Sequence, residues 1–302
     1  MHLGMVGLGR MGMNMCRRLI DGGHKVSAYN RSEEKIKEAE GYGAISAYSL
    51  EELVDSLPSP RVVWVMLPAG EATEAAIDTI QSLLNEDDII VEGGNSFYKD
   101  DIRRSLALQQ DRIKYVDAGV SGGIWGLKEG YCLMVGGERA SFDYLEPLFK
   151  TLAPVDGYMY MGEVGAGHFV KMVHNGIEYA MMEAYGEGFE LLKSSRYGAE
   201  MDFAKVSTLW NRGSVIRSWL LELLEDAFEK DNKLESITGH VDDSGEGRWT
   251  VQEAVEMGVA APAIADSLFR RFRSRQKDPF AEKVLAALRA EFGGHAVKKS
   301  QK

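Results

Sequence analysis

Residues 165–179 combine several reactive side-chain types without a proline. If this stretch is helical, four polar side chains fall within an arc of about 100° on one helix face: Lys171, His174, Asn175 and Glu178. An amine, an imidazole, an amide and a carboxylate on one face can bind a polar substrate and move its protons. A solvated face would explain Lys171 and Glu178 as an ion pair. It does not explain Gly176, because glycine inside a helix costs ~1 kcal/mol relative to alanine. We therefore predict a catalytic face, with another part of the chain packed closely against Gly176.

A second candidate site is a glycine-rich turn near the start of the chain. The apolar run 3–6 is followed by the spacing G-x-G-x-x-G, which comprises Gly7, Leu8, Gly9, Arg10, Met11 and Gly12. In this context the first glycine turns the chain, the second lets a pyrophosphate approach, and the third lets helix and strand pack closely. The N-terminus of the helix then supplies N–H groups to the phosphates. The spacing predicts a dinucleotide site; a tight turn without a ligand is the simpler alternative.

The end of the second predicted strand indicates which dinucleotide is bound. NAD enzymes usually have Asp or Glu there, whereas this chain reads Tyr29-Asn30-Arg31-Ser32. Arg31 can bind a 2′-phosphate and stack on adenine, with Asn30 and Ser32 as further donors. This favours NADP, with NAD possible. Alternatively, Ser32 caps the next helix and Arg31 is a solvated surface charge.

Two further glycine-rich loops follow predicted strands, at 92–96 and 117–123. Ligands of open α/β sheets bind beyond the carboxyl ends of the strands. We therefore expect Asn95 and Ser121 to face the nicotinamide and the substrate, and Leu67, at the end of another strand, to contact the cofactor.

These residues need a scaffold, and the first half of the chain alternates β-rich runs with helical periodicity. That alternation is typical of a parallel sheet with helices on both faces. The expected strands are 3–7, 25–29, 62–67, 88–92, 114–118, 131–135 and 155–161, with helices at 12–20, 50–57, 74–84 and 100–109.

The pattern changes at residue 166, where a single helix of about 29 residues, 166–194, is predicted. Further helices are expected at 202–211, 215–228, 250–257, 261–273 and 279–292, with a loop at 229–247 and an irregular tail at 297–302. The predicted fold is an α/β Rossmann-like N-terminal domain, 1–164, with an all-α C-terminal domain, 165–302. So many apolar helices in a domain of this size favour an oligomer.

Composition excludes several classes of protein. The 302 residues include 46 acidic and 35 basic side chains, a formal charge of −11, which argues against binding to nucleic acid or an anionic membrane. Cys16 and Cys132 are too far apart for a metal knuckle, and we expect both to be buried free thiols in a reducing compartment. No run approaches the ~18 apolar residues of a membrane span, and no signal peptide is evident, so a cytoplasmic location is expected.

Together these motifs resemble the 6-phosphogluconate dehydrogenase family, in its short-chain bacterial type, within the β-hydroxyacid dehydrogenase superfamily. The resemblance covers nearly the whole chain. It rests on the first glycine motif, Asn30-Arg31-Ser32, Gly93-Gly94-Asn95-Ser96, Val120-Ser121-Gly122-Gly123, the run from Lys171 to Tyr179, and Phe292-Gly293-Gly294-His295. Other members of the superfamily share the glycine motif and the lysine but lack the neighbouring His-Asn-Gly-Ile-Glu-Tyr.

The resemblance implies a reaction of the pentose phosphate pathway, in which 6-phospho-D-gluconate and NADP give D-ribulose 5-phosphate, CO2 and NADPH without a metal. It implies that Lys171 removes the 3-hydroxyl proton and then stabilises the enolate, and that Glu178 protonates C1. It also implies residues that hold the substrate's carboxylate and hydroxyls: Asn95, Ser121, Gly122, Gly123, His174 and Asn175.

For the substrate phosphate, the resemblance implies Tyr179, Arg271, and Arg289 with His295 reaching over from a partner subunit of a homodimer or homotetramer. Arg270, Arg273 and Arg275 leave the choice of Arg271 open.

The chain departs from the larger family members at two positions. Ser244 stands where they have a phosphate-binding lysine, for which Arg248 is a possible substitute. Pro68 stands where NADP-dependent members often have a lysine, which keeps NAD open as the cofactor.

Two other functions stay open. One is a dehydrogenase for an unphosphorylated substrate such as 3-hydroxyisobutyrate, which would not need Arg271, Arg289 and His295. The other is a non-catalytic NADP-binding protein.

Overall fold

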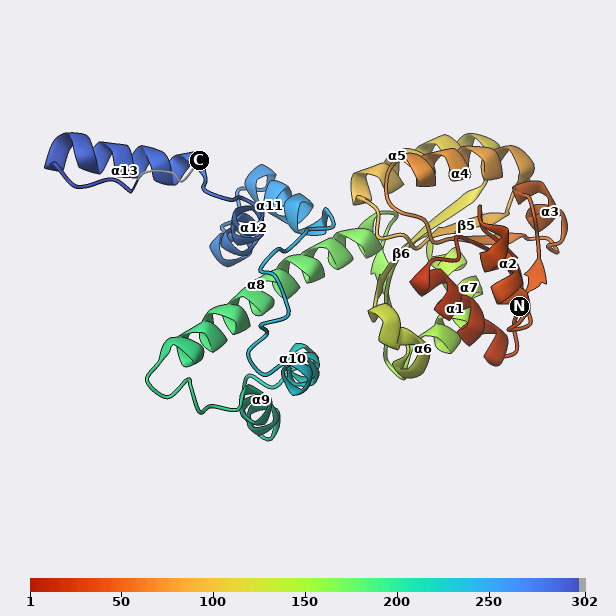
Figure 1. The fold of residues 1–302 in the computed structure, drawn as a ribbon. Coiled ribbons are helices and arrows are strands. Elements are labelled where there is room, and N and C mark those ends of the chain that lie inside the picture. The colour runs from red at the N-terminus through yellow and green to blue at the C-terminus, as the bar shows by residue number, and fades with distance from the viewer. Residues whose placement is uncertain (299–302) are drawn as a thin grey trace. The chain divides into compact units, whose positions relative to one another are not determined.

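The computed structural model describes residues 1–298 and divides the chain into two compact units, 1–175 and 176 onward. The first unit is an α/β domain and the second is helical, as the sequence predicts (Figure 1). The division falls inside one long helix, α8 (Ala166–Ser194), whose bounds are those predicted. Each unit is therefore built around part of the same helix.

The first unit contains an eight-stranded sheet with the order β3-β2-β1-β4-β5-β6-β7-β8. The strands are β1 (His2–Val6), β2 (Lys25–Tyr29), β3 (Ile45–Ser46), β4 (Val62–Val65), β5 (Ile89–Glu92), β6 (Lys114–Ser121), β7 (Cys132–Gly137) and β8 (Tyr158–Gly162). All neighbours are parallel except β6 and β7, which pair antiparallel with Ser121 opposite Cys132. The prediction of a parallel sheet is wrong at this pair. The connection 122–131 is too short for the crossover of a dozen or more residues that parallel strands need.

Helices cover both faces of this sheet. They are α1 (Arg10–Asp21), α2 (Glu33–Glu40), α3 (Leu50–Asp55), α4 (Glu71–Leu83), α5 (Tyr98–Leu108), α6 (Gly126–Glu129) and α7 (Arg139–Leu152), with 3-10 turns η1 (Gln109–Asp111) and η2 (Gly123–Trp125). Helix α7 lies outside the predicted helices, and it contains a proline, Pro147. The predicted helices also omit the full extent of α2, which buries only Ile36 and Ala39 and so has a weak apolar pattern.

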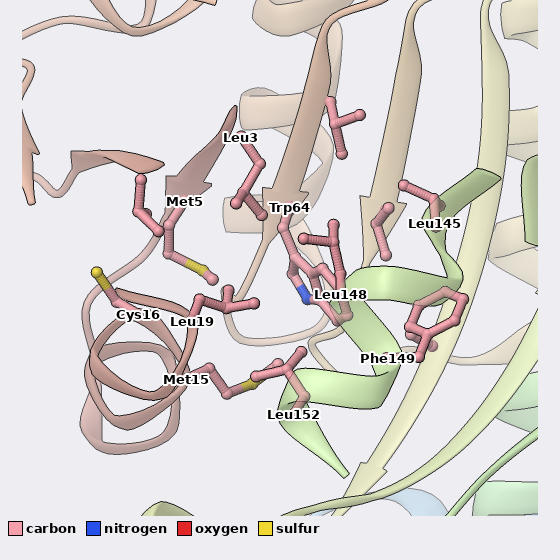
Figure 2. Close-up of a cluster of buried hydrophobic side chains, with 14 of the residues drawn as sticks. Leu3, Met5, Met15, Cys16, Leu19, Trp64, Leu145, Leu148, Phe149 and Leu152 are labelled. Carbon is pink, nitrogen blue, oxygen red and sulfur yellow. The ribbon is translucent and has the colours of Figure 1, made fainter. Parts of the chain in front are cut away.

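Successive side chains of a strand point to opposite faces of the sheet, and each face has its own apolar core. Trp64 packs on one face with residues of α1 and α7, including Met15, Leu19 and Phe149 (Figure 2). Its neighbours Val63 and Val65 belong to the other core. Cys16 is buried in the first core as predicted, but Cys132 is exposed, because it is the first residue of β7. The expectation of a buried Cys132 is therefore wrong.

The second unit holds the rest of α8 and five further helices. These are α9 (Phe203–Asn211), α10 (Trp219–Lys230), α11 (Glu246–Glu256), α12 (Pro262–Ser274) and α13 (Phe280–Gly293). The predicted start of α10 at 215 is wrong, because the Ser218 side chain accepts a hydrogen bond from Leu221 N and begins the helix there. The predicted loop 229–247 is shorter, since α10 reaches Lys230 and α11 begins at Glu246. Residues 299–302 of the predicted tail lie outside the described residues.

The apolar core of the second unit is small. Phe189, Phe203, Leu221 and Phe228 form its buried centre. Helix α13 has no buried residue, and Phe280 and Phe292 are 79% and 80% exposed. Within residues 1–298, no helix has the length and apolar character needed to cross a membrane.

Candidate active site

The glycine-rich turn between β1 and α1 has the geometry of a dinucleotide site. Gly7 has a positive φ of 98°, and a Cβ there would lie 2.4 Å from the Met66 carbonyl oxygen. A Cβ on Gly12 would lie 2.1 Å from the Gly7 carbonyl oxygen, so only glycine lets α1 pack on the turn. A Cβ on Gly9 would meet no atom within 4 Å. The three glycines thus supply a turn, a close packing contact and an open approach to the helix N-terminus.

The predicted cofactor residues surround this turn. Leu8 N donates to Asn30 Oδ1 at 3.1 Å, which ties the turn to the end of β2. Arg31 and Arg10 are exposed. Ser32 stands at the N-cap of α2, but its side chain accepts no capping hydrogen bond. Ser32 is therefore at the predicted cap position, and its hydroxyl makes no cap bond that would keep it from a ligand.

Leu67 and Met11 complete this part of the site. The Leu67 side chain would be 2.9 Å from a Cβ on Gly7, and its carbonyl oxygen would be 2.2 Å from a Cβ on Gly94. Leu67 thus lies between the glycine turn and the loop that carries Asn95. Met11 is half-buried against the first core.

Asn95 joins the loop after β5 to the end of β6. Its Nδ2 donates to the Val120 carbonyl oxygen at 3.1 Å, and its Oδ1 accepts from Val120 N at 2.9 Å. The backbone of Asn95 is left-handed, with φ 56°. The amide nitrogen carries two hydrogens, and this pairing uses one. Asn95 therefore holds the loop and keeps a donor for a ligand.

Ser121, the last residue of β6, lies beside the predicted catalytic face of α8. Its Oγ is 3.4 Å from His174 Nε2, and the next two residues, Gly122 and Gly123, both have positive φ. The predicted substrate loop thus turns away from β6 immediately after Ser121.

Lys171 is buried at 5% exposure and lies directly against β6. A Cβ on Gly119 would be 2.5 Å from Lys171 Cβ, so glycine is required for the strand to touch the helix. Lys171 Nζ donates to Asn175 Oδ1, which also lies 3.0 Å from His174 Nδ1. The first unit therefore brings Lys171, His174 and Asn175 together, as the helix spacing predicts, and places Ser121 of β6 beside His174.

Within the second unit, the packing at Gly176 is confirmed. A Cβ there would be 2.8 Å from Thr250 Cγ2 and 3.1 Å from Ile264 Cγ2, so α11 and α12 approach the backbone of α8. Glu178 is half-buried and follows Lys171 by two turns of α8.

Tyr179 and Arg271 form a stacked pair in the second unit. The Arg271 guanidinium lies 3.4 Å from the centroid of the Tyr179 ring, and its Nη1 donates to the Asp242 carbonyl oxygen at 2.8 Å. Tyr179 Oη accepts from Ser244 N at 3.2 Å. Aromatic stacking orients a guanidinium while leaving its charge available.

The neighbouring arginines are already neutralised by carboxylates. Arg270 pairs with Glu183 and Glu187, Arg273 with Glu282, and Arg275 with Asp243. Arg271 makes no ion pair within the described chain. The geometry thus favours Arg271 among the four as the anion-binding residue.

Arg248, the possible substitute for a lysine at position 244, is bound to a carboxylate. Its Nε and Nη2 donate to the two carboxylate oxygens of Asp243 at 2.5 and 3.1 Å. Ser244 Oγ donates to Glu246 Oε2. Both side chains are therefore engaged by acidic residues of the same segment.

Arg289 and His295 come together at the end of α13. Gly294 ends the helix with a left-handed φ of 64°, and His295 N donates to the Arg289 carbonyl oxygen at 3.4 Å. This C-cap places the imidazole within about one turn of the arginine. The backbone of His295 is thus bonded to that of Arg289 at the end of the helix.

Glu92, Asp101 and His168 form the one cluster within the described residues whose ligand atoms are close enough to hold a metal ion. However, Arg104 Nη1 lies 3.4 Å from Asp101 Oδ1 and 3.7 Å from Glu92 Oε2. A guanidinium so close to both carboxylates opposes a divalent cation by charge repulsion. The residues present therefore fit an ion-pair network better than a metal site.

Comparison with known proteins agrees with this geometry. Residues 2–165 match the NAD-binding domain of 6-phosphogluconate dehydrogenase, and residues 167–301 match the C-terminal domain of the same enzyme. A Bacillus subtilis protein provisionally named as a 6-phosphogluconate dehydrogenase is 48% identical over 299 residues, covering 99% of this chain and 100% of that protein. The NAD-dependent, decarboxylating 6-phosphogluconate dehydrogenase of Haloferax volcanii is 46% identical, covering 98% of each chain.

A solved structure gives the same result. The 6-phosphogluconate dehydrogenase of Plasmodium falciparum, studied with NADP+ and with 6-phosphogluconate, superposes with a TM-score of 0.83 at 28% identity. The match covers 100% of this chain and 67% of that enzyme. The chain described here belongs to the 6-phosphogluconate dehydrogenase family.

Proposed function

We propose that this protein oxidises and decarboxylates 6-phospho-D-gluconate to D-ribulose 5-phosphate and CO2, with reduction of NADP, in the cytoplasm. The observation that carries the proposal is the cluster of Lys171, Asn175, His174 and Ser121 in a domain with a dinucleotide-binding turn. We also propose that residues 1–164 bind the dinucleotide and that residues 165–302 bind the substrate and a second subunit.

Lys171 is the proposed general base. Its amine takes the proton of the 3-hydroxyl as C3 loses a hydride, for which a nicotinamide bound at the glycine turn would be the acceptor. The resulting 3-keto group is the electron sink when the C1–C2 bond breaks and CO2 departs. Lys171, now an ammonium, stabilises the negative charge that develops on the 3-oxygen. Its buried bond to Asn175 fixes Nζ for both steps.

Glu178 is the proposed general acid. After CO2 leaves, the enediol must gain a proton at the carbon that becomes C1 of the product. Glu178 lies two turns from Lys171 on α8 and shares its helix face. Asn95, Ser121, Gly122, Gly123, His174 and Asn175 are the proposed contacts of the carboxylate and hydroxyls.

The proposed phosphate site begins with Arg271 and Tyr179. A substrate phosphate can bind the guanidinium that Tyr179 orients, since no carboxylate competes for it within the described residues. Arg289 and His295 complete the site from a partner subunit. The exposed apolar residues of α13, which carries Arg289, support this assignment, because a helix without buried residues is stabilised by packing on another surface.

Arg31 is the residue that we propose binds the 2′-phosphate of NADP. It is exposed at the end of β2, and no carboxylate occupies the positions 29–32 where NAD enzymes bind the ribose. Asn30 and Ser32 are the proposed further donors, with the backbone of residues 7–12 around the pyrophosphate.

The test is an initial-rate assay with 6-phosphogluconate, NADP and NAD, following both the absorbance of reduced cofactor and CO2 release. We expect turnover with equal yields of the two products and a preference for NADP. Reduction of either cofactor with 3-hydroxyisobutyrate but not with 6-phosphogluconate would replace the proposed substrate. No reduction with any substrate, despite NADP binding, would favour a non-catalytic protein.

A further inference from the structure

The first unit buries a network of charged residues that the proposed reaction does not use directly. His168 is 1% exposed, and its Nδ1 lies 2.7 Å from Asp101 Oδ2 on α5. Asp101 Oδ1 accepts a hydrogen bond from Tyr115 Oη at 2.8 Å. Glu92 and Arg104 complete the network, at 3.8 Å from His168 Nδ1 and 3.4 Å from Asp101 Oδ1 respectively. These residues come from β5, α5, β6 and α8, so the network joins four elements.

Asp117 fixes the first turn of α8 to the sheet. Its Oδ1 accepts from Gly165 N at 2.7 Å and its Oδ2 from His168 N at 2.9 Å. These N–H groups lie at the start of the helix, where no intrahelical partner exists. Asp117 is four residues before Ser121 on β6, and His168 is three residues before Lys171 on α8. The same carboxylate thus sets the position of the helix that carries the proposed base.

Glu92 fixes the third element, the loop that carries Asn95. Its Oε1 accepts from Gly94 N at 2.6 Å, and Asn95 follows directly. Its other oxygen faces Arg104 and His168 at 3.7 and 3.8 Å. The Asn95 loop is therefore tied to the same network as α8.

The electrostatics of the network favour a proton on His168. Burial by itself would lower the pKa of His168, but the charge and hydrogen bond of Asp101 outweigh it and raise that pKa to about 10. Burial raises the pKa of both Glu92 and Asp117, and the nearby His168 opposes that rise. The imidazole of His168 is thus held by the acidic residues that surround it.

Such a network is a poor source of stability. Desolvating charges costs about as much as their attraction returns, and buried atoms without partners cost more. Glu92 Oε2 and His168 Nε2 both lack a hydrogen-bond partner within the described residues. The desolvation cost of these buried residues is explained if the network fixes the elements that carry the reacting side chains.

We infer that His168 is a positioning residue for the dehydrogenase reaction: its imidazole, held by Asp101, adds to the backbone bond with Asp117 and keeps Lys171 in register with Asn95 and Ser121. The inference rests on the proposed function. A displacement of about 1 Å between a base and its substrate can cost ~100-fold in rate. Loss of the imidazolium therefore slows hydride transfer without altering the residues that bind the dinucleotide.

The test compares His168→Leu, which removes both charge and donor, with His168→Asn, whose amide nitrogen takes the place of Nδ1. Each is assayed for kcat, KM and the isotope effect with 3-deuterated 6-phosphogluconate, well below its melting temperature. We expect kcat of His168→Leu to fall ~10–100-fold, the isotope effect to rise, and the Kd for NADP to stay within about twofold. His168→Asn should recover part of kcat.

Asp88→Asn is the matched control for lost stability. Asp88 is another buried carboxylate of the same unit, which binds Arg61 and Asn85 before β5, at the amino end of the strand whose carboxyl end is Glu92. This variant should lower the melting temperature and leave kcat and the isotope effect unchanged. A folded His168→Leu protein with wild-type kcat and isotope effect would overturn the inference. If that variant does not fold, Asp101→Asn, which changes the partner of the imidazole, takes its place, and wild-type kcat and isotope effect in that protein overturn the inference.

A second readout separates this inference from the proposed function. The rate at which trinitrobenzenesulfonate labels Lys171, located by peptide mass spectrometry, reports on the position of the amine without any turnover. Wild-type protein that does not oxidise 6-phosphogluconate contradicts the proposed function. A labelling rate that changes several-fold in the His168 variants but not in Asp88→Asn still supports positioning, and equal rates in all four proteins overturn it.

Discussion

The two units hold their charged residues in different ways. In the first, His168, Asp101, Asp117 and Glu92 are buried, and they bond to α5, the first turn of α8 and the loop before Asn95. In the second, Arg270 and Arg273 are exposed, Arg271 and Arg275 are half-buried, and α13 has no buried residue. The difference separates two tasks. The proposed chemistry uses residues of a single chain, whereas the proposed recognition of the phosphate uses residues of the second unit and a partner's α13.

The largest expected effect comes from the buried half of this comparison. Lys171→Met keeps the length of the side chain and removes the base, so kcat with 6-phosphogluconate should fall ~10³–10⁴-fold. The Kd for NADP, measured by calorimetry, should not change, because the glycine turn is intact. Lys114→Met, at the amino end of β6, is the control and should retain full activity. Retention of more than a tenth of kcat in Lys171→Met would show that the base lies elsewhere.

Substitutions at the proposed phosphate site of the second unit should change KM rather than kcat. Arg271→Ala removes one charge-assisted contact worth about 2 kcal/mol, so KM for 6-phosphogluconate should rise ~30-fold. Arg270→Ala is the matched control, because the adjacent guanidinium is paired with Glu183 and Glu187. The ratio of activity on gluconate between wild type and Arg271→Ala should stay near one. An equal rise of KM in both variants would mean that only the net charge of α12 matters.

The first unit was also easier to predict in outline than the second, because its motifs are local in the sequence. The glycine turn, the strand ends and the face of α8 follow from spacing within about 15 residues. The charged network did not follow. Glu92 and His168 are 76 residues apart, and each resembles an ordinary surface charge until the sheet brings them together.

The choice among the arginines of α12 has the same cause. Adjacent positions on one helix differ only in what faces them, and the carboxylates that engage Arg270 lie more than 80 residues earlier, on α8. The antiparallel pairing of β7 likewise depends on a connection whose short length limits the topology without specifying it. The ion pairs of the α12 arginines and the direction of β7 both depend on contacts between residues far apart in the chain. A single sequence does not show which distant residues are in contact.

A mixing experiment tests whether the second unit needs a partner. Lys171→Met and Arg289→Ala chains are each nearly inactive at a low substrate concentration. If Arg289 acts in trans, a mixed dimer has one intact site, so equal mixtures after subunit exchange should recover about one quarter of wild-type activity. Arg289 acting within its own chain gives no recovery, although size-exclusion chromatography shows mixed dimers.

The smallest expected effect concerns the cofactor. Arg31→Ala removes the proposed contact with the 2′-phosphate, so kcat/KM for NADP should fall ~10-fold while that for NAD stays within about twofold. Arg17→Ala is the control, because Arg17 is stacked 4.1 Å above the Tyr42 ring and the substitution removes the same charge from the same unit. The measurement is the initial rate at varied cofactor and saturating 6-phosphogluconate. An equal fall with NADP and NAD would assign Arg31 to stacking on the adenine, which both cofactors share, and would leave the 2′-phosphate to another residue of the turn.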